Sequence, residues 1–558
     1  MLLRRLQSVE QLNEVVRHRP DLRLMPAVAG VWLTAALAIL WPLRQVMIAA
    51  IVLGIALMSA VVGRKLRRRR TPHRVAGTTL ALATACMVAV LIAIALQLHL
   101  RASSPITELS RQHQDLSLTL EVSSVPRLLT AGQGPPQLIF EAVVLHATAN
   151  ARSATGRLTI VVLAKPSWSG VHQGDRVTTA GVLAAPRPGS REAAVLHPST
   201  IPLAVTPGRD ESQQLITAMR TSWIAAARQV WGETSPDTAG LLPGMVMGDR
   251  SGTTASLDEA MKTVGLTHLT AVSGANCTLI LASLMLVLRT AKVSRLLAVP
   301  LALLGLMGFV LLVGPDPSVL RAAVMGSIGA MAILGGRPKR TGALLSLAIL
   351  VLLMADPWLA RDFAFILSVL ATLGLHLVGQ RCVVWLQALL PVWLAQAMAI
   401  PLAAQLFCSP VIVLLQARLT VYTIPANMLA APLIALVTMV GTLGLVLAAV
   451  VPPVAALCAA VSGVGAWWVA LVARFMSGLP AASLPWPEGV QGMVLMALLN
   501  VLVLLLLLAV VEREHSRLLA RRLVRYLPDR WRHRYGFLVV AVMAAGLTVW
   551  WTAAVRQL

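Results

Sequence analysis

Long apolar runs recur along most of the chain, and short polar segments separate them. Many of these runs approach the ~20 residues that an α-helix needs to cross a bilayer. The pattern therefore predicts a polytopic α-helical membrane protein. The predicted spans cover residues 26–43, 45–62 and 75–96 in the N-terminal part, and 277–288, 297–313, 318–335, 342–355 and 363–378 later in the chain.

Residues 100–208 follow a different pattern. From Leu116 to Ser123, apolar and polar residues alternate without exception, which is typical of a strand with one buried face. Turns rich in glycine and proline separate this strand from further strand-like runs at 138–145, 158–164, 177–183 and 193–196. Short strands at this spacing predict a small all-β domain, either an OB-like barrel or a small β-sandwich.

Two other segments have patterns of their own. Apolar residues at helical spacing predict an amphipathic helix from Gln213 to Trp231, which lies either on the membrane or against a helix bundle. Between residues 382 and 511, prolines interrupt the apolar runs, and we expect some of the pieces to be re-entrant. These prolines are Pro391, Pro401, Pro410, Pro425 and Pro432.

The composition excludes a soluble globular protein, because hydrophobic residues make up 57% of the chain and charged residues only 13%. The 47 Lys and Arg against 23 Asp and Glu give a net charge of +24, which taken alone would suggest nucleic-acid binding. Many of these cations, however, lie in short loops between apolar runs, where the positive-inside bias places them in any membrane protein. The β domain itself carries nine Lys and Arg against six Asp and Glu, which is a weak phosphate-binding surface.

The charge of the loops predicts a topology. Basic loops at 289–295, 336–340 and 379–381 alternate with loops that contain Asp316 and Asp356. Because basic loops stay in the cytoplasm, the β domain and the C-terminus are expected to be extracytoplasmic. The expected localisation is the cytoplasmic (inner) membrane, as a multi-pass protein. The expected parts are an N-terminal three-span region (1–99), the β domain (100–208), a segment with the amphipathic helix and polar motifs (209–275), a transmembrane domain (276–511), a basic cytoplasmic segment (512–535) and a last span (536–558).

The sequence contains none of the compact motifs that hold a metal ion or a nucleotide. All five cysteines lie in or beside apolar segments, and there is neither a Cys-x-x-Cys nor a His-x-His pair. There is also no Gly-Lys-Ser/Thr phosphate loop, no Gly-x-Ser-x-Gly elbow and no His-Glu-x-x-His. We therefore expect no metal site, no cofactor and no catalytic residue, and the chain is not expected to be an enzyme.

The most unusual segment runs from Leu241 to Asn276. It contains Gly248-Asp249-Arg250-Ser251, followed by Gly265-Leu-Thr-His268-Leu-Thr-Ala-Val-Ser273-Gly274. Polar groups beside a membrane remain only where they are packed in protein or line a water-filled route, because an unsatisfied group costs several kcal/mol. The simpler interpretation is a loop that leads into a helix, with Ser273 or Asn276 as its N-cap.

This segment resembles the competence family of DNA-internalisation membrane channels, the ComEC type. In that family, Gly-Asp-Arg-Ser precedes Gly-Leu-x-His-Leu-x-Ala-x-Ser-Gly at the entry to the first helix of the transport domain. Two residues after Gly274 this chain has Asn276, where family members commonly have histidine; a proton-dependent role does not carry over, although hydrogen bonding does.

Three later segments extend the resemblance over most of residues 25–510. Ser318-Val-Leu-Arg321-Ala322 is similar to the family's Ser-x-x-Arg-Ala helix start. The segment from Asp356 to Val369, with Asp362 and Ser368, is similar to its Asp-Pro…Asp-x-Gly-Phe-Gln-Leu-Ser-Phe block, although Ala364, Ile366 and Val369 replace Gly, Gln and Phe. Pro425-Ala-Asn427-Met-Leu-Ala-Ala-Pro432 is similar to its Asn-Leu-x-x-x-Pro segment.

Three of these polar residues also have simpler structural interpretations. Arg321 could snorkel to the interface from a helix that Asp316 caps and Pro317 starts. Asp362 could cap the span that follows it, and Asn427 could satisfy a backbone interrupted by Pro425. The candidate residues for a DNA route remain Asp249, Arg250, His268, Ser273, Gly274, Asn276, Arg321, Asp362, Ser368 and Asn427.

The resemblance implies an inner-membrane channel that passes single-stranded DNA into the cytoplasm during natural transformation. It also implies that a DNA receptor, a nuclease and a cytoplasmic translocation ATPase are separate proteins, and that the channel can be a homo-oligomer in the lipid bilayer. The chain stops at Leu558, where many family members continue into a metallo-β-lactamase-like domain. The β domain could receive the strand by stacking bases on Phe140 and Trp168, or could serve assembly instead.

Two other functions stay open on the sequence alone. A secondary transporter could hold a small anionic solute at the breaks around Ser273-Gly274 and Pro425–Asn427. A membrane-embedded hydrolase could use Ser273 activated by His268, although residues five apart on a helix point in different directions.

Overall fold

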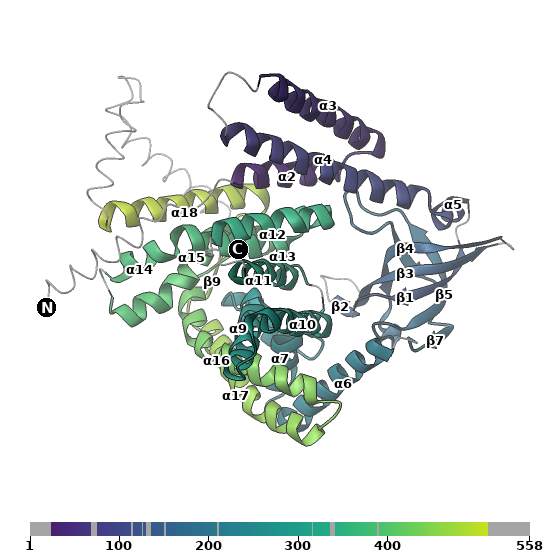
Figure 1. Ribbon diagram of the computed structural model, residues 1–558. Coiled ribbons are helices and arrows are strands. Elements are labelled where there is room, and N and C mark those ends of the chain that lie inside the picture. Colours follow the sequence, from purple (N-terminus) through teal and green to yellow (C-terminus); the bar gives the residue numbers. More distant parts are fainter. Residues whose placement is uncertain are drawn as a thin grey trace.

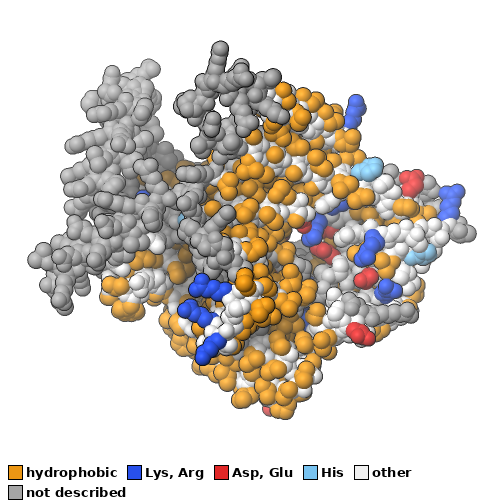
Figure 2. Space-filling view, in the orientation of Figure 1, with side chains coloured by type: hydrophobic (Ala, Val, Ile, Leu, Met, Phe, Trp, Pro, Cys, Tyr) orange, Lys and Arg blue, Asp and Glu red, His pale blue; other side chains and the backbone are white. Residues whose placement is uncertain are grey.

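The computed structural model describes residues 24–67, 75–112, 115–124, 126–129, 136–149, 152–208, 211–314, 316–334, 341–387 and 390–511. Within these ranges, eight helices are long and apolar enough to cross a membrane, and a separate β domain lies at one end of the helical part (Figure 1). Figure 2 shows hydrophobic side chains covering most of the described helical part, where one group of Lys and Arg side chains is visible, and charged side chains of both signs on the β domain. The chain is therefore a multi-pass membrane protein, as predicted. The basic segment 512–535 and the predicted span 536–558 lie outside the described residues.

The N-terminal region consists of α2 (Met25–Ala38), α3 (Leu43–Arg67) and α4 (Val75–Ala102). α3 and α4 are long enough to cross a membrane, as predicted, whereas α2 has 14 residues and is shorter than the predicted span 26–43. Trp32 on α2 connects this region to the rest of the helices. Its indole nitrogen donates a hydrogen bond to the Ala360 carbonyl oxygen over 2.9 Å, and its ring stacks on Phe365 with 5.3 Å between the ring centroids. Because both aromatic side chains are in the apolar layer, their contact fixes the place of α2 beside the later helices.

The β domain is a closed barrel. Its strands are β1 (Leu116–Val122), β2 (Arg127–Leu129), β3 (Gln137–Ala149), β4 (Arg152–Ala164), β5 (Arg176–Ala184), β6 (Ala194–Pro198) and β7 (Ala204–Thr206). β1 pairs with both β3 and β5, β3 pairs with β4, and β6 joins β4 to β5, so that five strands form a complete circuit. The β4–β6 pair is parallel and the other pairs in the circuit are antiparallel. This closure confirms the OB-like barrel rather than the β-sandwich.

The two aromatic residues considered for base stacking belong to the core of this barrel. Phe140 is 2% exposed and Trp168 is 1% exposed, and their ring centroids lie 6.0 Å apart. The inward positions of β1 are buried beside them, as the alternating pattern of its sequence requires. Neither aromatic ring is therefore available to stack on a base.

The helical part after the barrel begins with α6 (Glu211–Trp231), the predicted amphipathic helix. Its buried side is formed by Trp223, Ala226 and Ala227, which pack into the largest apolar core of the molecule. The Trp231 indole donates to the Ala459 carbonyl oxygen over 2.9 Å. Of the two interpretations of this helix, packing against the bundle is therefore the observed one.

The remaining elements continue the bundle. They are α7 (Pro236–Met247), α8 (Ala255–Thr263), η2 (Thr267–Thr270), α9 (Gly274–Thr290), α10 (Arg295–Val313), α11 (Pro317–Leu334), α12 (Thr341–Ala355), η3 (Pro357–Arg361), α13 (Phe363–Gly374), the π-helical turn η4 (Leu375–Gly379), α14 (Gln380–Gln387), α15 (Val392–Leu415), β8 (Arg418–Thr420), α16 (Thr423–Leu447), α17 (Pro452–Ser477), β9 (Ser483–Pro485) and α18 (Gly489–Val511).

Two predictions about this region were wrong. The predicted loop at 379–381 is helical, because α13, η4 and α14 form one continuous span from Phe363 to Gln387. The prolines do not divide the chain into re-entrant pieces either: Pro401 and Pro410 lie inside α15, and Pro432 lies inside α16. Membrane helices tolerate such prolines because neighbouring helices and side chains satisfy the freed carbonyl groups.

The barrel is attached to one end of the helical part. Trp358 on η3 donates to the Ser190 carbonyl oxygen over 2.9 Å, and the Arg101 guanidinium carbon lies 4.4 Å from the centre of the Trp358 ring. Arg191 forms an ion pair with Asp356 at 3.3 Å, and Arg127 lies 3.9 Å from Asp316. The loops that carry Asp316 and Asp356 are thus on the side of the barrel, and the α9–α10 turn lies at the far end of α10.

This arrangement leads to a prediction about topology. A reporter inserted at Lys292 in the α9–α10 turn and a reporter inserted at Gly170 on the barrel should report opposite sides of the membrane. Both positions are exposed, and α10 extends for 19 residues between the turn and the barrel side. The positive-inside bias further predicts the cytoplasmic signal at Lys292. The same compartment at both positions would contradict the arrangement.

Candidate functional site

The polar motif segment forms a compact non-spanning structure inside the helical part. α7 is buried along most of its length and ends at Gly248, whose φ of +77° is the left-handed conformation typical of a helix C-terminus. The chain then returns along α7, since Thr253 Oγ1 lies 3.5 Å from the Gly240 carbonyl oxygen, and continues into α8. A second left-handed glycine, Gly265, leads into η2 and so to the start of α9.

Arg321 lies at the centre of the predicted site residues. It is one turn inside α11, which Pro317 starts as predicted, but the side chain does not snorkel: the residue is only 7% exposed. Its Nε donates to Ser368 Oγ over 2.9 Å, and its Nη1 lies 3.1 Å from Met325 Sδ. A Cβ added at Gly274 would lie 3.0 Å from Nη2, so the guanidinium is close to the first turn of α9. Three segments distant in sequence therefore meet at this side chain.

Asn276, in the first turn of α9, forms a second polar group. It is 3% exposed, and its Oδ1 accepts hydrogen bonds from Ser273 Oγ over 3.0 Å and from Thr438 Oγ1 over 3.2 Å. Ser273 occupies the N-cap position of α9, but its hydroxyl makes no hydrogen bond to the backbone of the helix. The simple capping interpretation is therefore incomplete, because Ser273 and Asn276 bond to each other and to α16.

The start of α9 combines two positive features without a nearby carboxylate. The N-terminus of a helix carries unpaired N–H groups and about half a positive charge, and the Arg321 guanidinium adds a full one. Among the described residues, no Asp or Glu oxygen lies within 4.0 Å of this guanidinium. Burying an unpaired charge costs several kcal/mol. An anion at this place would offset that cost.

Asp249, Arg250 and His268 lie in the non-spanning segment and make local contacts. Asp249 Oδ1 accepts from the Ser251 backbone N–H over 2.9 Å, and Arg250 Nε donates to the Thr270 carbonyl oxygen over 3.2 Å. His268 is exposed, and its Nδ1 lies 3.2 Å from the Gly265 carbonyl oxygen. These three residues hold the turn structures around α8 and η2, and no hydrogen bond joins them to Arg321 in the part of the chain that is described.

Asp362 and Asn427 have the local roles that their simpler interpretations gave. Asp362 is the N-cap of α13, and its Oδ1 accepts from the Phe365 N–H over 2.8 Å. Asn427 Nδ2 donates to the Thr423 carbonyl oxygen over 2.8 Å, four residues earlier in α16. Neither residue contacts Arg321 through a hydrogen bond in the described structure.

Two residues of the site were missed from the sequence. Thr438 reaches Asn276 from α16, and Ser318 Oγ donates to the Val272 carbonyl oxygen over 3.0 Å, which holds the segment before α9 against α11. Ser318 belongs to the quoted Ser-x-x-Arg segment, so its motif was a usable signal. Thr438 lies in the apolar helix α16, which also contains Thr442, and no pattern in the sequence distinguishes it from a packed hydroxyl.

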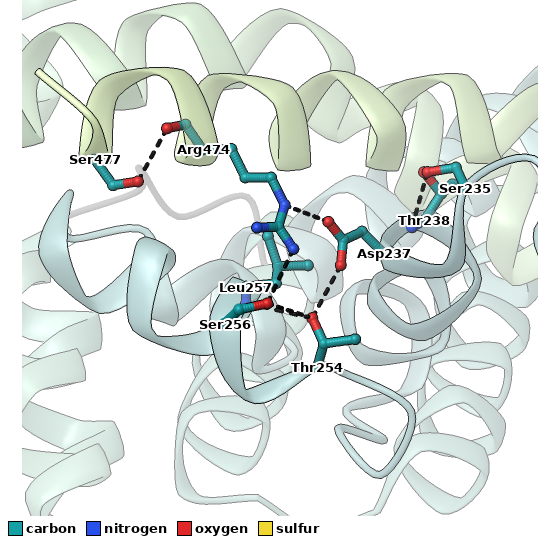
Figure 3. A network of polar contacts seen from close by, with 8 residues as sticks. All are labelled: Ser235, Asp237, Thr238, Thr254, Ser256, Leu257, Arg474 and Ser477. Carbon is teal, nitrogen blue, oxygen red and sulfur yellow. Dashed lines mark hydrogen bonds and ion pairs between the residues drawn. The ribbon is translucent and has the colours of Figure 1, made fainter.

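A separate polar network fastens the non-spanning segment to α17 (Figure 3). The Arg474 Nε donates to Asp237 Oδ2, and Arg474 Nη2 donates to Ser256 Oγ over 3.1 Å. Thr254 Oγ1 donates to Asp237 Oδ1 over 2.9 Å, so one carboxylate joins the start of α7, the start of α8 and the end of α17. The hydrogen bond from Arg474 holds the pKa of the Asp237 carboxyl below its ordinary value.

The described residues include no group of three or more His, Cys, Asp or Glu side chains that could hold a metal ion. The hydrolase considered from the sequence also lacks its geometry. Ser273 Oγ donates to Asn276, whereas the His268 ring faces the Gly265 carbonyl oxygen, so the two side chains are not hydrogen-bonded to each other. A serine without a contacting base is not an activated nucleophile.

Gly265 allows a test of the packing that places the site. Its φ is +71°, and a Cβ there would lie 2.6 Å from Thr423 Oγ1. Gly265→Ala should lower the free energy of unfolding by about 2 kcal/mol or more, from left-handed strain and this overlap. The measurement is thermal unfolding of the purified protein in detergent. Gly308→Ala is the control, because nothing lies within 4 Å of its added Cβ. Equal destabilisation by both changes would contradict the close packing of Gly265 on Thr423.

The Asp237–Arg474 network predicts a pH-dependent stability. Because the folded pKa of Asp237 is depressed, its contribution is complete above the ordinary aspartate pKa of ~3.9 and is lost as pH falls through the lower folded value. Asp237→Asn should cost about 1 kcal/mol at pH 7, since the pair is partly exposed. The gap in unfolding midpoint between wild type and variant should close below pH 4. A gap that stays constant down to pH 3 would show that the carboxylate charge is irrelevant.

Comparisons with known proteins cover the same part of the chain. The family model described as Competence protein matches residues 245–511, which contain every helix that contacts Arg321. ComE operon protein 3 of Bacillus subtilis (strain 168) is 29% identical over 197 residues, which cover 35% of this chain and 25% of that relative. No solved structure matches the chain significantly. Residues 245–511 of this chain are therefore a Competence protein domain of the ComEC type.

Proposed function

We propose that this protein is a channel in the cytoplasmic membrane through which single-stranded DNA enters the cell during natural transformation. The Competence protein domain supports a role in DNA uptake. The observation that supports a channel for a polyanion is the buried Arg321 guanidinium at the N-terminus of α9, with no carboxylate of the described residues within hydrogen-bonding distance.

The chemistry of this place suits a phosphodiester. A guanidinium offers up to five N–H donors in a plane, and two of its nitrogens, Nε and Nη1, already have contacts within the protein. Nη2 lies close to Gly274 in the first turn of α9, where the first backbone N–H groups lack α-helical partners, although that of Asn276 donates to the Ser273 carbonyl oxygen over 3.0 Å. A passing phosphate could therefore bind the guanidinium and the helix N-terminus together, as anions do at other helix starts.

The surrounding hydroxyls give the strand a polar surface once it has left water. Ser318 lies on α11 with Arg321, and Ser368 lies on the neighbouring helix α13. Ser273, Asn276 and Thr438 form the hydrogen-bonded group at α9 and α16. Without a strand, these side chains are hydrogen-bonded to other groups of the protein. We infer that during passage they replace these hydrogen bonds by contacts with phosphates and bases, so that the polar groups are satisfied in both states.

The proposed orientation places the barrel on the extracytoplasmic side of the membrane. The α9–α10 turn carries Arg289, Lys292 and Arg295, all exposed, at the end of α10 that is distant from the barrel. Because basic loops remain in the cytoplasm, the barrel side is extracytoplasmic and Arg321 lies near the outer end of the membrane domain. A strand would then meet Arg321 early, and the cytoplasmic end of the route would lie beyond α11 and α13.

The barrel is proposed to be a fixed rim of this entrance. Its 185–193 loop is bound by Trp358 and Arg101, and its two core aromatic rings cannot stack on bases. Capture of DNA, digestion of the other strand and the driving force are assigned to separate proteins: a DNA receptor, a nuclease and a cytoplasmic ATPase. This division follows from the non-enzymatic role proposed for the chain itself.

A secondary transporter for a small anionic solute is the competing function. The same guanidinium and helix N-terminus would bind a free carboxylate or phosphate. The sequence predicted that Asn427 would form the second half of such a site. Its side chain instead donates a hydrogen bond within α16 and none to the residues around Arg321 in the described structure. The homology to competence proteins therefore favours DNA over a small solute.

Substitution of Arg321 tests the proposed function. Arg321→Lys keeps the charge but loses the planar donors, and transformation should fall about tenfold, the equivalent of one charged hydrogen bond. Arg321→Glu places a like charge against the phosphate and should reduce transformation below detection. The measurement is transformation frequency, normalised to the amount of protein in the membrane.

Arg228→Glu is the matched control, because Arg228 is exposed on α6 and the same charge change there should leave transformation unchanged. Binding of DNA at the cell surface should persist in Arg321→Glu cells, because only entry of DNA into the cytoplasm is blocked. Normal transformation by Arg321→Glu at normal abundance would show that the arginine is outside the DNA route. A deletion strain that transforms normally would refute the function as a whole.

A further inference from the structure

One span of the membrane domain is interrupted by a π-helical turn that carries a histidine. The turn η4 (Leu375–Gly379) lies between α13 and α14, inside the apolar span Phe363–Gln387. The Nε2 atom of His376 is buried and has no hydrogen-bond partner among the described residues. An unsatisfied polar atom in an apolar span is costly, and π-helical turns are frequent at functional sites.

His376 belongs to a line of polar residues that starts at Arg321. Ser368, which accepts from Arg321 Nε, is followed at four-residue intervals by Thr372 and His376. Thr372 Oγ1 donates to the Ser368 carbonyl oxygen over 2.9 Å, which is the contact expected between neighbours on one helix face. All three residues are half-buried, whereas the Nε2 atom of His376 is itself buried.

The opposite face of this helix is closely packed. A Cβ added at Gly374 would lie 2.7 Å from the Ala403 carbonyl oxygen and 2.8 Å from the Phe407 ring, so Gly374 is pressed against α15. Residues two positions before and after it, Thr372 and His376, point to the other side of the helix, because two residues turn an α-helix by about 200°. The polar line therefore faces away from α15.

The π-helical turn keeps His376 on this line. In an uninterrupted α-helix, a residue eight positions after Ser368 would be rotated from it by about 80°. A π-helical turn contains more residues than an α-helical turn, so it reverses part of this rotation. The turn thus brings His376 back toward the face of the helix on which Ser368 contacts Arg321.

We propose that Ser368, Thr372 and His376 form the continuation of the DNA route below Arg321, and that the His376 imidazole donates a hydrogen bond to a phosphate oxygen of the passing strand. The proposal rests on the function proposed above and names a second contact for the same substrate. It accounts for the unpartnered nitrogen, which has its partner only while a strand or its accompanying water occupies the route. Arg321 is the entry contact and His376 is the contact inside the membrane.

Cysteine accessibility tests whether His376 faces an aqueous route. His376→Cys is made in full-length protein in which the five native cysteines are replaced by alanine, and membranes are treated with a charged methanethiosulfonate reagent. The cysteine at 376 should be modified, and single-stranded oligothymidylate should slow the modification at least threefold. Leu375→Cys is the control at the neighbouring exposed position. It should remain unmodified, because we expect this exposed apolar side chain to face lipid.

Transformation measurements test whether the contact matters for the strand. His376→Leu removes the donor and should lower transformation about tenfold, whereas His376→Asn retains an N–H donor and should stay within about twofold of wild type. His99→Leu is the matched control, since His99 is exposed at the end of α4. Equal losses in the Leu and Asn variants would indicate a packing role and overturn the proposal.

The two proposals fail in different ways. If Arg321→Glu abolishes transformation while His376→Leu is normal and the cysteine at 376 is not modified, the route does not pass η4 and only this inference is wrong. If the deletion strain transforms normally, the proposed function is wrong, and modification at 376 without protection by DNA would mark a water route for another solute.

Discussion

The buried charge of Arg321 is the constraint on which the arrangement of the membrane domain depends. Apolar helices can pack against each other in many ways at similar free energy. A guanidinium buried between them needs a hydrogen-bond acceptor for each of its N–H groups. Here α13 supplies Ser368, α11 supplies Met325, and the start of α9 approaches so closely that a Cβ at Gly274 would lie 3.0 Å from the guanidinium. The three helices are therefore positioned by one side chain as much as by their apolar contacts. Since none of these partners is an anion, the charge itself remains uncompensated within the described structure, which is an arrangement suited to a substrate that brings its own negative charge.

The non-spanning segment from α7 to η2 makes this arrangement possible. A helix that begins inside the protein exposes backbone N–H groups where water is scarce, so the chain that leads to it must be packed and hydrogen-bonded throughout. Gly248 and Gly265 supply the left-handed turns, Thr423 packs directly on Gly265, and Asp237 fastens the segment to α17 through Arg474. Arg474 lies more than two hundred residues from Asp237 in sequence. The position of the α9 N-terminus is thus determined by contacts with the last third of the described chain, which is why the site belongs to the whole membrane domain.

Local features were predictable from the sequence, and distant contacts were not. The alternation at Leu116–Ser123 indicated a strand because side chains of a strand point to opposite faces, and the barrel contains that strand as β1. Asp362 was recognisable as a helix cap from its place before an apolar run. The meeting of Gly274, Arg321 and Ser368 could not be derived from pattern, because nothing in one sequence relates residues about fifty positions apart on different helices. The prolines of α15 were misleading for another reason: rules from soluble helices treat proline as a break, whereas neighbouring membrane helices satisfy the groups that it frees.

The attachment of the barrel determines what the barrel can contribute. A module that receives a flexible strand by itself needs exposed rings and a basic groove. This barrel has Phe140 and Trp168 in its core, and its Arg127 and Arg191 side chains are directed to Asp316 and Asp356 of the helical part. These two cations thus contact the helical part, and the loop at Ser190 is hydrogen-bonded to Trp358 and Arg101. Those contacts place the barrel beside the loops at the starts of α11 and α13, the same helices that carry Arg321 and Ser368. In the proposed channel, a fixed barrel at this position would limit the directions from which a strand could approach the guanidinium, and that restriction would need no affinity of the barrel for DNA.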